Sequence, residues 1–155
     1  MKIIYHCFGG SHSSVTAAAL HLGLLSRERL PTAAELMALP YYDKTSNGDF
    51  GSIHYMGSDE DGNEVYILGK KSLGNRFGCL LRGVAEILGK DNQLLVVNVM
   101  DRVNASMKLG GFTSRRIGIP ALGRPVVIQG TQQAFEAMCN LVETVKISVL
   151  DCRQR

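Results

Sequence analysis

After Met1 the chain opens with K-I-I-Y-H-C-F-G-G-S-H-S-S-V-T-A-A-A-L, residues 2–20. The apolar run at residues 2–8 predicts a short buried strand, and residues 15–25 predict a helix that is apolar on nearly every side. A helix with so little polar surface is usually covered on both flanks. We therefore expect a strand, a tight loop and a covered helix at the start of an α/β fold.

Strands and helices are expected to alternate along the rest of the chain. The Asp61-Gly62 pair favours a tight reversal, and therefore a hairpin over residues 52–69. This order is typical of a three-layer α/β sandwich with a mainly parallel sheet and an added antiparallel hairpin, and 155 residues suit a single domain. Glu35 lies three residues after Thr32, which predicts a capping box at the start of a further helix. The other expected elements are a helix over residues 77–88, strands over residues 94–100 and 125–129, and a last helix capped by Thr131.

The composition indicates a globular protein, with 45% hydrophobic and 20% charged residues. A net charge of +3 is too small to indicate nucleic-acid binding. No run approaches the roughly twenty apolar residues of a membrane-spanning helix, and the start is too short and polar for a signal peptide. The four cysteines form no C-x-x-C pair and the histidines have no paired spacing, so we expect no dedicated metal site. We also expect the thiols to be reduced and the protein to be cytoplasmic.

The loop after the first strand has the composition of an anion-binding loop. In open α/β sheets, ligands bind outside the carboxyl ends of the strands, and a helix N-terminus offers free N–H groups and a positive dipole end. Glycines let the backbone approach a ligand closely, and serines add hydroxyl donors. The alternative is a tight turn in which a serine only caps the helix. The predicted anion-binding residues of this loop are Gly9, Gly10, Ser11, Ser13 and Ser14.

Residues 110–116, G-G-F-T-S-R-R, have similar chemistry. Arg115 and Arg116 are predicted to clamp a phosphate or carboxylate, unless this is only a surface loop with a basic end. Asp101 follows the expected strand 94–100 and is a candidate catalytic base. If the bound molecule is a nucleotide, Asp101 could instead bind Mg²⁺. The alternative is that Asp101 only forms a turn or caps a helix, as aspartates after strands commonly do. No lysine lies between Lys2 and Lys44, so the loop lacks the lysine of an ordinary nucleotide-hydrolysing P-loop.

Basic residues also gather in two windows that contain no acid. These windows are residues 65–85 and residues 102–135. A basic window of this kind either lines an anion site or forms a solvated surface, and the sequence leaves both interpretations open.

The segment C-F-G-G-S-H-S-S, Cys7 to Ser14, resembles the C-x-x-x-x-x-R-[ST] loop of protein tyrosine phosphatases. The strand–loop–helix start and the chain length are similar to low-molecular-weight tyrosine phosphatases and arsenate reductases. The resemblance implies that Cys7 is a nucleophile whose thiolate Ser14 supports, and His12 is a candidate base beside it. The sequence departs from that family because Ser13 stands where the anion-clamping arginine belongs, and because no Asp-Pro pair supplies the acid.

As a whole the chain resembles a bacterial family of unknown function (domain of unknown function 3189). The resemblance is carried by M-K-I-I-Y-H-C-F-G-G-S-H-S-S, S-M-K-L-G-G-F-T-S-R-R and G-I-P-A-L-G-R-P, and it implies no activity. Three functions are therefore expected. The leading one is binding of a phosphorylated small molecule or nucleotide; the alternatives are a cysteine-dependent phosphatase or arsenate reductase, and a non-catalytic regulatory or interaction module with a degenerate phosphate loop.

Overall fold

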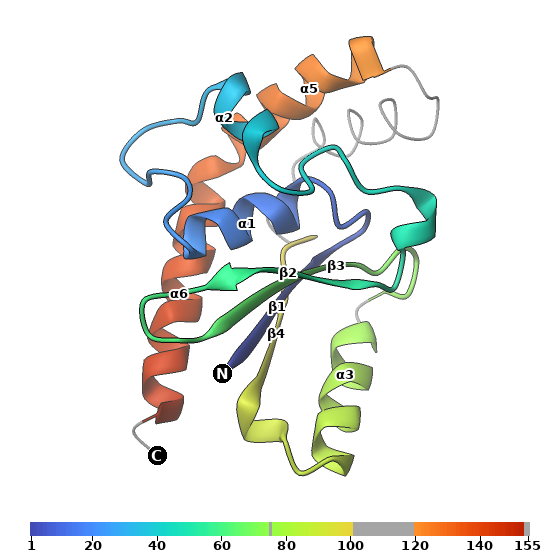
Figure 1. Cartoon of the computed structure of the whole chain (residues 1–155), viewed down its shortest axis with the longest axis vertical. Helices are drawn as coiled ribbons and strands as arrows, with labels where there is room; N and C mark the ends of the chain where they lie inside the picture. The colour runs from blue at the N-terminus through green and yellow to red at the C-terminus, as the bar shows by residue number, and fades with distance from the viewer. Residues whose placement is uncertain (75, 101–119, 154–155) are drawn as a thin grey trace.

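The structure is a computed structural model of the whole chain, and it describes residues 1–74, 76–100 and 120–153 (Figure 1). A four-stranded sheet has the strand order β2-β3-β1-β4. β1 pairs in parallel with both β3 and β4, whereas β2 and β3 form an antiparallel hairpin. The expected mixed, mainly parallel sheet is therefore confirmed. The strands are β1 (Lys2–Cys7), β2 (Ile53–Ser58), β3 (Glu64–Gly69) and β4 (Leu94–Asn98).

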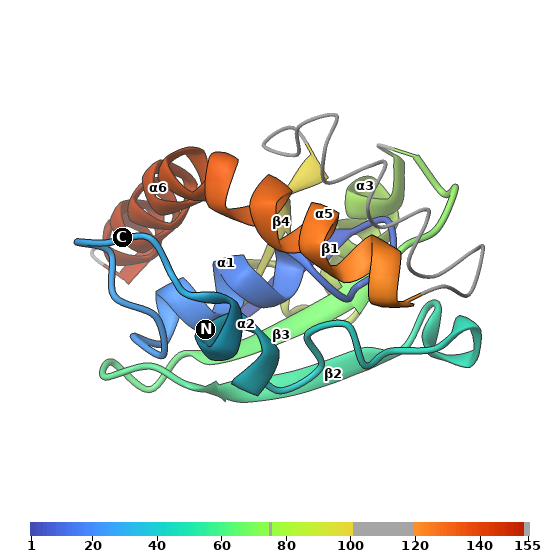
Figure 2. The same ribbon diagram turned by 90° about the horizontal axis from the view of Figure 1, so that it is seen from above.

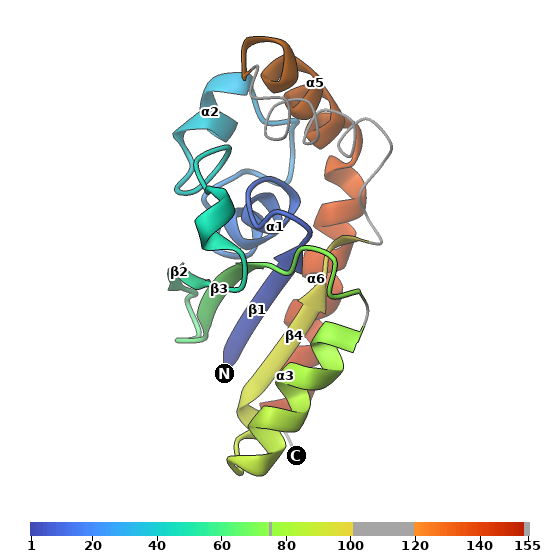
Figure 3. The same cartoon turned by 90° about the vertical axis from the view of Figure 1, so that its right-hand side faces the viewer.

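Helices cover both faces of the sheet (Figure 3). α1 (Ser13–His21) and α6 (Phe135–Arg153) pack on one face, and α3 (Arg76–Ile87) packs on the other. α2 (Ala33–Ala38) and α5 (Pro120–Gln133) lie at the end of the molecule toward which β1 runs (Figures 1 and 2). Two short 3-10 helices complete the described elements, η1 (Asn47–Asp49) and η2 (Asp91–Gln93).

The main hydrophobic core lies between the sheet, α1 and α6. Side chains alternate along β1, so that Ile3 and Tyr5 enter this core while Ile4 joins Leu68 and Phe77 in a smaller cluster under α3. All nine residues of α1 are buried, which agrees with its apolar sequence. The same β1 therefore anchors both layers, and its carboxyl end lies between them.

The expected strand at residues 125–129 is wrong, because these residues belong to α5. A short run of β-branched residues fits either period, and here Val127, Gly130 and Thr131 are buried at the three- and four-residue spacing of a helix. Thr131 also does not cap the last helix. It lies inside α5, donates its hydroxyl to the Val127 carbonyl at 2.8 Å, and α6 begins at Phe135.

Other local predictions are confirmed. Thr32 and Glu35 form the predicted capping box at the start of α2. The helix expected over residues 77–88 is α3, and Gly89 follows it with a positive φ of 62°. No helix among the described residues has the length and apolarity required to span a membrane.

Candidate functional site

Two loops leave neighbouring strands toward opposite faces of the sheet. The first loop, residues 8–12, leads from β1 to α1, and the second loop, residues 70–74, leads from β3 toward α3. β1 and β3 are adjacent and parallel, whereas α1 and α3 cover opposite faces. Ligand sites of open α/β sheets lie at such a divergence, outside the carboxyl ends of the strands. The topology therefore places the glycine- and serine-rich loop at the position where a ligand is expected.

The first loop meets the end of β3 backbone to backbone at Gly9, Gly10 and Gly69. Gly10 has φ of +66°, and a Cβ added there would lie 2.6 Å from the Gly69 nitrogen. A Cβ on Gly69 would lie 2.8 Å from the Gly9 carbonyl carbon. Only glycine permits this approach, so Gly10 and Gly69 have a structural role that does not depend on any ligand.

Cys7 lies at the base of the first loop and is 4% exposed. Its Sγ accepts a hydrogen bond from the Gly10 N–H at 3.1 Å and lies 3.2 Å from the Ser14 Oγ. The structure thus brings together the thiol, a loop amide and the first-turn serine. Neither Ser13 nor Ser14 caps α1: the N-cap is His12, and its side chain makes no capping hydrogen bond.

Several backbone N–H groups at this junction have no acceptor within residues 1–74, 76–100 and 120–153. The Phe8 and Gly10 amides donate to the sulfur atoms of Met100 and Cys7. Among the described residues, no atom accepts from five other amides, and four of these belong to residues that are at most 4% exposed. Buried amides without partners are rare, and helix starts are normally capped by a side chain. The five amides are those of Gly9, Ser11, Ser13, Ser14 and Val15.

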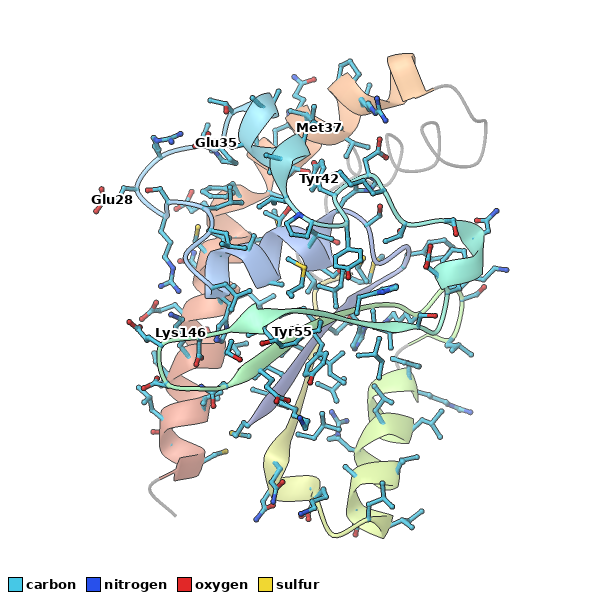
Figure 4. All side chains as sticks on the ribbon, viewed as in Figure 1. Glu28, Glu35, Met37, Tyr42, Tyr55 and Lys146 are labelled. Atoms are coloured by element: carbon cyan, nitrogen blue, oxygen red, sulfur yellow. The ribbon has the colours of Figure 1, made fainter. Side chains whose placement is uncertain are left out.

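An ionic cluster lies at the rim of the first loop. Asp43, whose side chain is 6% exposed, bonds to His12 Nε2 at 3.1 Å and accepts from Arg124 Nε of α5 at 2.7 Å. The edge of the His12 ring also contacts Tyr42, which lies in the connection after α2 (Figure 4). The sequence pattern indicated His12 but not Asp43 or Arg124, because no spacing links residues 31 and 81 positions apart.

Lys70 is the most unusual charged residue near this junction. It begins the second loop and is only 4% exposed. Its Nζ donates to Asn98 Oδ1 of β4 at 3.3 Å, and no described carboxylate pairs with it. Lys70 belongs to the first of the two basic windows in the sequence, but composition did not indicate its burial.

The other predicted site residues, Asp101, Arg115 and Arg116, lie outside the described residues. Within the part of the chain that the structure describes, no group of three or more histidine, cysteine or acidic side chains is arranged to hold a metal ion.

A family model described as protein of unknown function (DUF3189) matches residues 2–147. The chain belongs to this family. The match includes both loops, Lys70 and Arg124, but the family description assigns no activity or residue roles. No curated protein and no solved structure matches the chain significantly, so the comparisons do not show the similarity to tyrosine phosphatases.

Proposed function

We propose that this member of the DUF3189 family binds the phosphate group of a small molecule or nucleotide at the junction of β1 and α1. The supporting observation is the set of five amides, in the first loop and in the uncapped first turn of α1, that find no acceptor among the described residues. Phosphate oxygens accept such hydrogen bonds, and the positive end of the helix dipole favours a bound anion.

The charges around the junction favour phosphate over a neutral ligand. Lys70 brings a positive charge to the second loop, and no described carboxylate pairs with it, whereas Arg124 at the rim of the first loop is paired with Asp43. A charge-assisted hydrogen bond from a lysine ammonium is stronger than a bond between neutral partners. The amides give the ligand its position, and Lys70 supplies most of the discrimination against uncharged molecules.

A phosphate-bearing ligand is expected to raise the melting temperature. At a ligand concentration about 100 times Kd, the linkage stabilises the native state by about 2.7 kcal/mol. For a chain of this size that corresponds to a rise in Tm of about 5 to 10 °C. Scanning fluorimetry with inorganic phosphate, phosphosugars and nucleotides measures this shift.

A charge variant locates the site. Ser13→Asp places a carboxylate at the start of α1, where it competes for the same amides and repels a phosphate, so the shift should disappear. Ser52→Asp makes the same charge change at an exposed serine and should keep the shift. The proposal is rejected if no anion raises Tm, or if Ser13→Asp retains the full response.

A second candidate, a cysteine-dependent phosphatase or arsenate reductase, is favoured by the surroundings of Cys7. The Gly10 N–H and the Ser14 hydroxyl are both placed to donate to a thiolate. In the phosphatase reaction Sγ attacks phosphorus, the P–O ester bond breaks, and the leaving oxygen takes a proton. Water then cleaves the S–P bond and regenerates the thiolate. His12 is the candidate group for the proton transfer.

Turnover of an aryl phosphate separates the two candidates. We expect Cys7→Ser to abolish phenolate release while phosphate binding persists, because serine is a far weaker nucleophile in this position. The control Cys152→Ser removes an exposed thiol and should retain wild-type turnover. Wild-type protein that binds phosphate without releasing phenolate would leave only the binding function, and undiminished turnover by Cys7→Ser would exclude Cys7 as the nucleophile.

A further inference from the structure

We infer that Lys70 is the counter-charge of the bound anion, and that the ligand reaches it with a terminal phosphate, as in a phosphate monoester or inorganic phosphate. This inference rests on the proposed phosphate-binding function and adds to it the cation that the first loop lacks. Neither a lysine nor an arginine occurs within residues 7–14, so the positive charge must come from another part of the chain.

Lys70 is buried but has few hydrogen-bond partners among the described residues. A lysine ammonium has three N–H donors, and the described residues give this one a single hydrogen bond, at 3.3 Å to the neutral amide oxygen of Asn98. That oxygen also accepts the Met100 N–H at 3.2 Å. A buried ammonium without an anionic partner is strongly unfavourable, because its lost hydration is not replaced. A bound anion would compensate the charge and accept the remaining hydrogen bonds.

Lys70 also lies beside the end of β1. Its backbone N–H donates to the Cys7 carbonyl at 2.9 Å, which fixes the start of the second loop beside the end of β1. Its Nζ reaches Asn98 on β4, and β1 lies between β3 and β4 in the sheet. The lysine side chain therefore passes across the carboxyl end of β1, where the first loop begins. The ammonium and the open amides thus border the same junction from its two sides.

The burial of the charged and amide-bearing residues favours one class of ligand. Lys70, Ser11, Ser13 and Ser14 are at most 4% exposed, and the contact between Gly10 and Gly69 closes the base of the junction. A terminal phosphate presents three oxygens and up to two negative charges to these buried donors. The phosphorus of a diester carries a substituent on both sides and only one charge, so it fits less well and gains less from Lys70.

A purely structural role makes a different prediction. If Lys70 served only to tie β3 to β4 through Asn98, removing its ammonium would weaken the fold in every buffer. If Lys70 is the counter-charge of a ligand, its removal relieves an uncompensated buried charge in phosphate-free buffer. The free protein should then be as stable as the wild type or more stable, while phosphate binding is lost.

The test compares Lys70→Met with Lys71→Met, which removes the neighbouring, exposed lysine. Titration calorimetry with phenyl phosphate and with the diester methyl phenyl phosphate measures affinity, and scanning fluorimetry in phosphate-free buffer measures Tm. We expect the wild type and Lys71→Met to bind the monoester at least tenfold more tightly than the diester. Lys70→Met should lose at least tenfold in monoester affinity, show no monoester preference and keep its Tm.

The outcomes separate this inference from the proposed function. Equal monoester affinity in the wild type and Lys70→Met overturns the assignment of Lys70 but leaves the phosphate site intact. Binding of neither ester nor inorganic phosphate by the wild type rejects both. A marked fall in Tm for Lys70→Met without phosphate supports the structural role and overturns the inference. Lys70→Gln removes the charge but retains a donor for Asn98, so it should lose monoester affinity and monoester preference as Lys70→Met does, and undiminished monoester affinity in Lys70→Gln would also overturn the inference.

Discussion

Replacing Gly10 with alanine is expected to destabilise the protein by about 3 to 5 kcal/mol, because two independent costs coincide. The first is conformational: φ is +66°, and a left-handed backbone costs a non-glycine residue about 1 to 3 kcal/mol. The second is steric: the new Cβ would lie 2.6 Å from the Gly69 nitrogen, and backbone atoms cannot move aside as a flexible side chain can. Urea denaturation of the purified variant measures the sum.

Two further glycines separate these costs. Gly62 has φ of +74°, and a Cβ added there would meet no heavy atom within 4 Å, so Gly62→Ala should show only the conformational cost. Gly69→Ala adds a Cβ 2.8 Å from Gly9 backbone atoms and should show mainly the steric cost. A Gly10→Ala protein no less stable than Gly62→Ala would mean that Gly10 is not in backbone contact with Gly69.

Local patterns in the sequence predicted much of the architecture. The apolar run at residues 2–8, the Asp61-Gly62 turn and the Thr32 capping box each specify a structure within a few residues, and all three are present. The wrong prediction of a strand at residues 125–129 also came from a local pattern. The β-branched run there fits a strand or a helix, and burial against the rest of the molecule selected the helix. Pro125 lies inside this helix.

The candidate site could be predicted only in part, because its members come from separate segments. The sequence indicates Cys7, His12 and Ser14, which lie close together at the end of β1, in the first loop and in the first turn of α1. It did not reveal that Lys70 is buried or that Arg124 meets Asp43, since both depend on how distant segments pack. Gly10 also illustrates the limit, because a glycine required for loop packing cannot be distinguished in the sequence from one that contacts a ligand.

A second buried polar network lies away from this junction and ties α1 to the β2–β3 turn. His21 bonds through Nδ1 to the Tyr5 hydroxyl at 2.8 Å and through Nε2 to Asp59 Oδ2 at 3.0 Å. Burial lowers the pKa of His21 despite the hydrogen bond to Asp59, which raises it. Burial alone would raise the pKa of Asp59, but hydrogen bonds from Asn63 and His21 together outweigh it and lower the pKa to about 2.

The pKa of Asp59 defines the direction of its pH dependence. Its carboxyl group is harder to protonate in the folded chain than in the unfolded chain, where a pKa near 3.9 is typical. The unfolded state therefore binds more protons as the medium is acidified. The stability that Asp59 contributes is fully present above about pH 5 and is lost as the pH falls toward 2.

Asp59→Asn is accordingly expected to cost about 3 kcal/mol at pH 7 and clearly less at pH 3. The new amide N–H₂ would face donors at His21 Nε2 and Asn63 Nδ2, so buried groups that were satisfied by a carboxylate oxygen lose their acceptor. Glu60→Gln neutralises the adjacent acid, whose side chain is 86% exposed, and should change stability by less than about 0.5 kcal/mol. Urea denaturation at both pH values compares the two variants. Equal losses in the free energy of unfolding for Asp59→Asn at pH 7 and pH 3 would show that the negative charge of Asp59 does not stabilise the turn. The contribution of Asp59 would then come only from the geometry of its side chain.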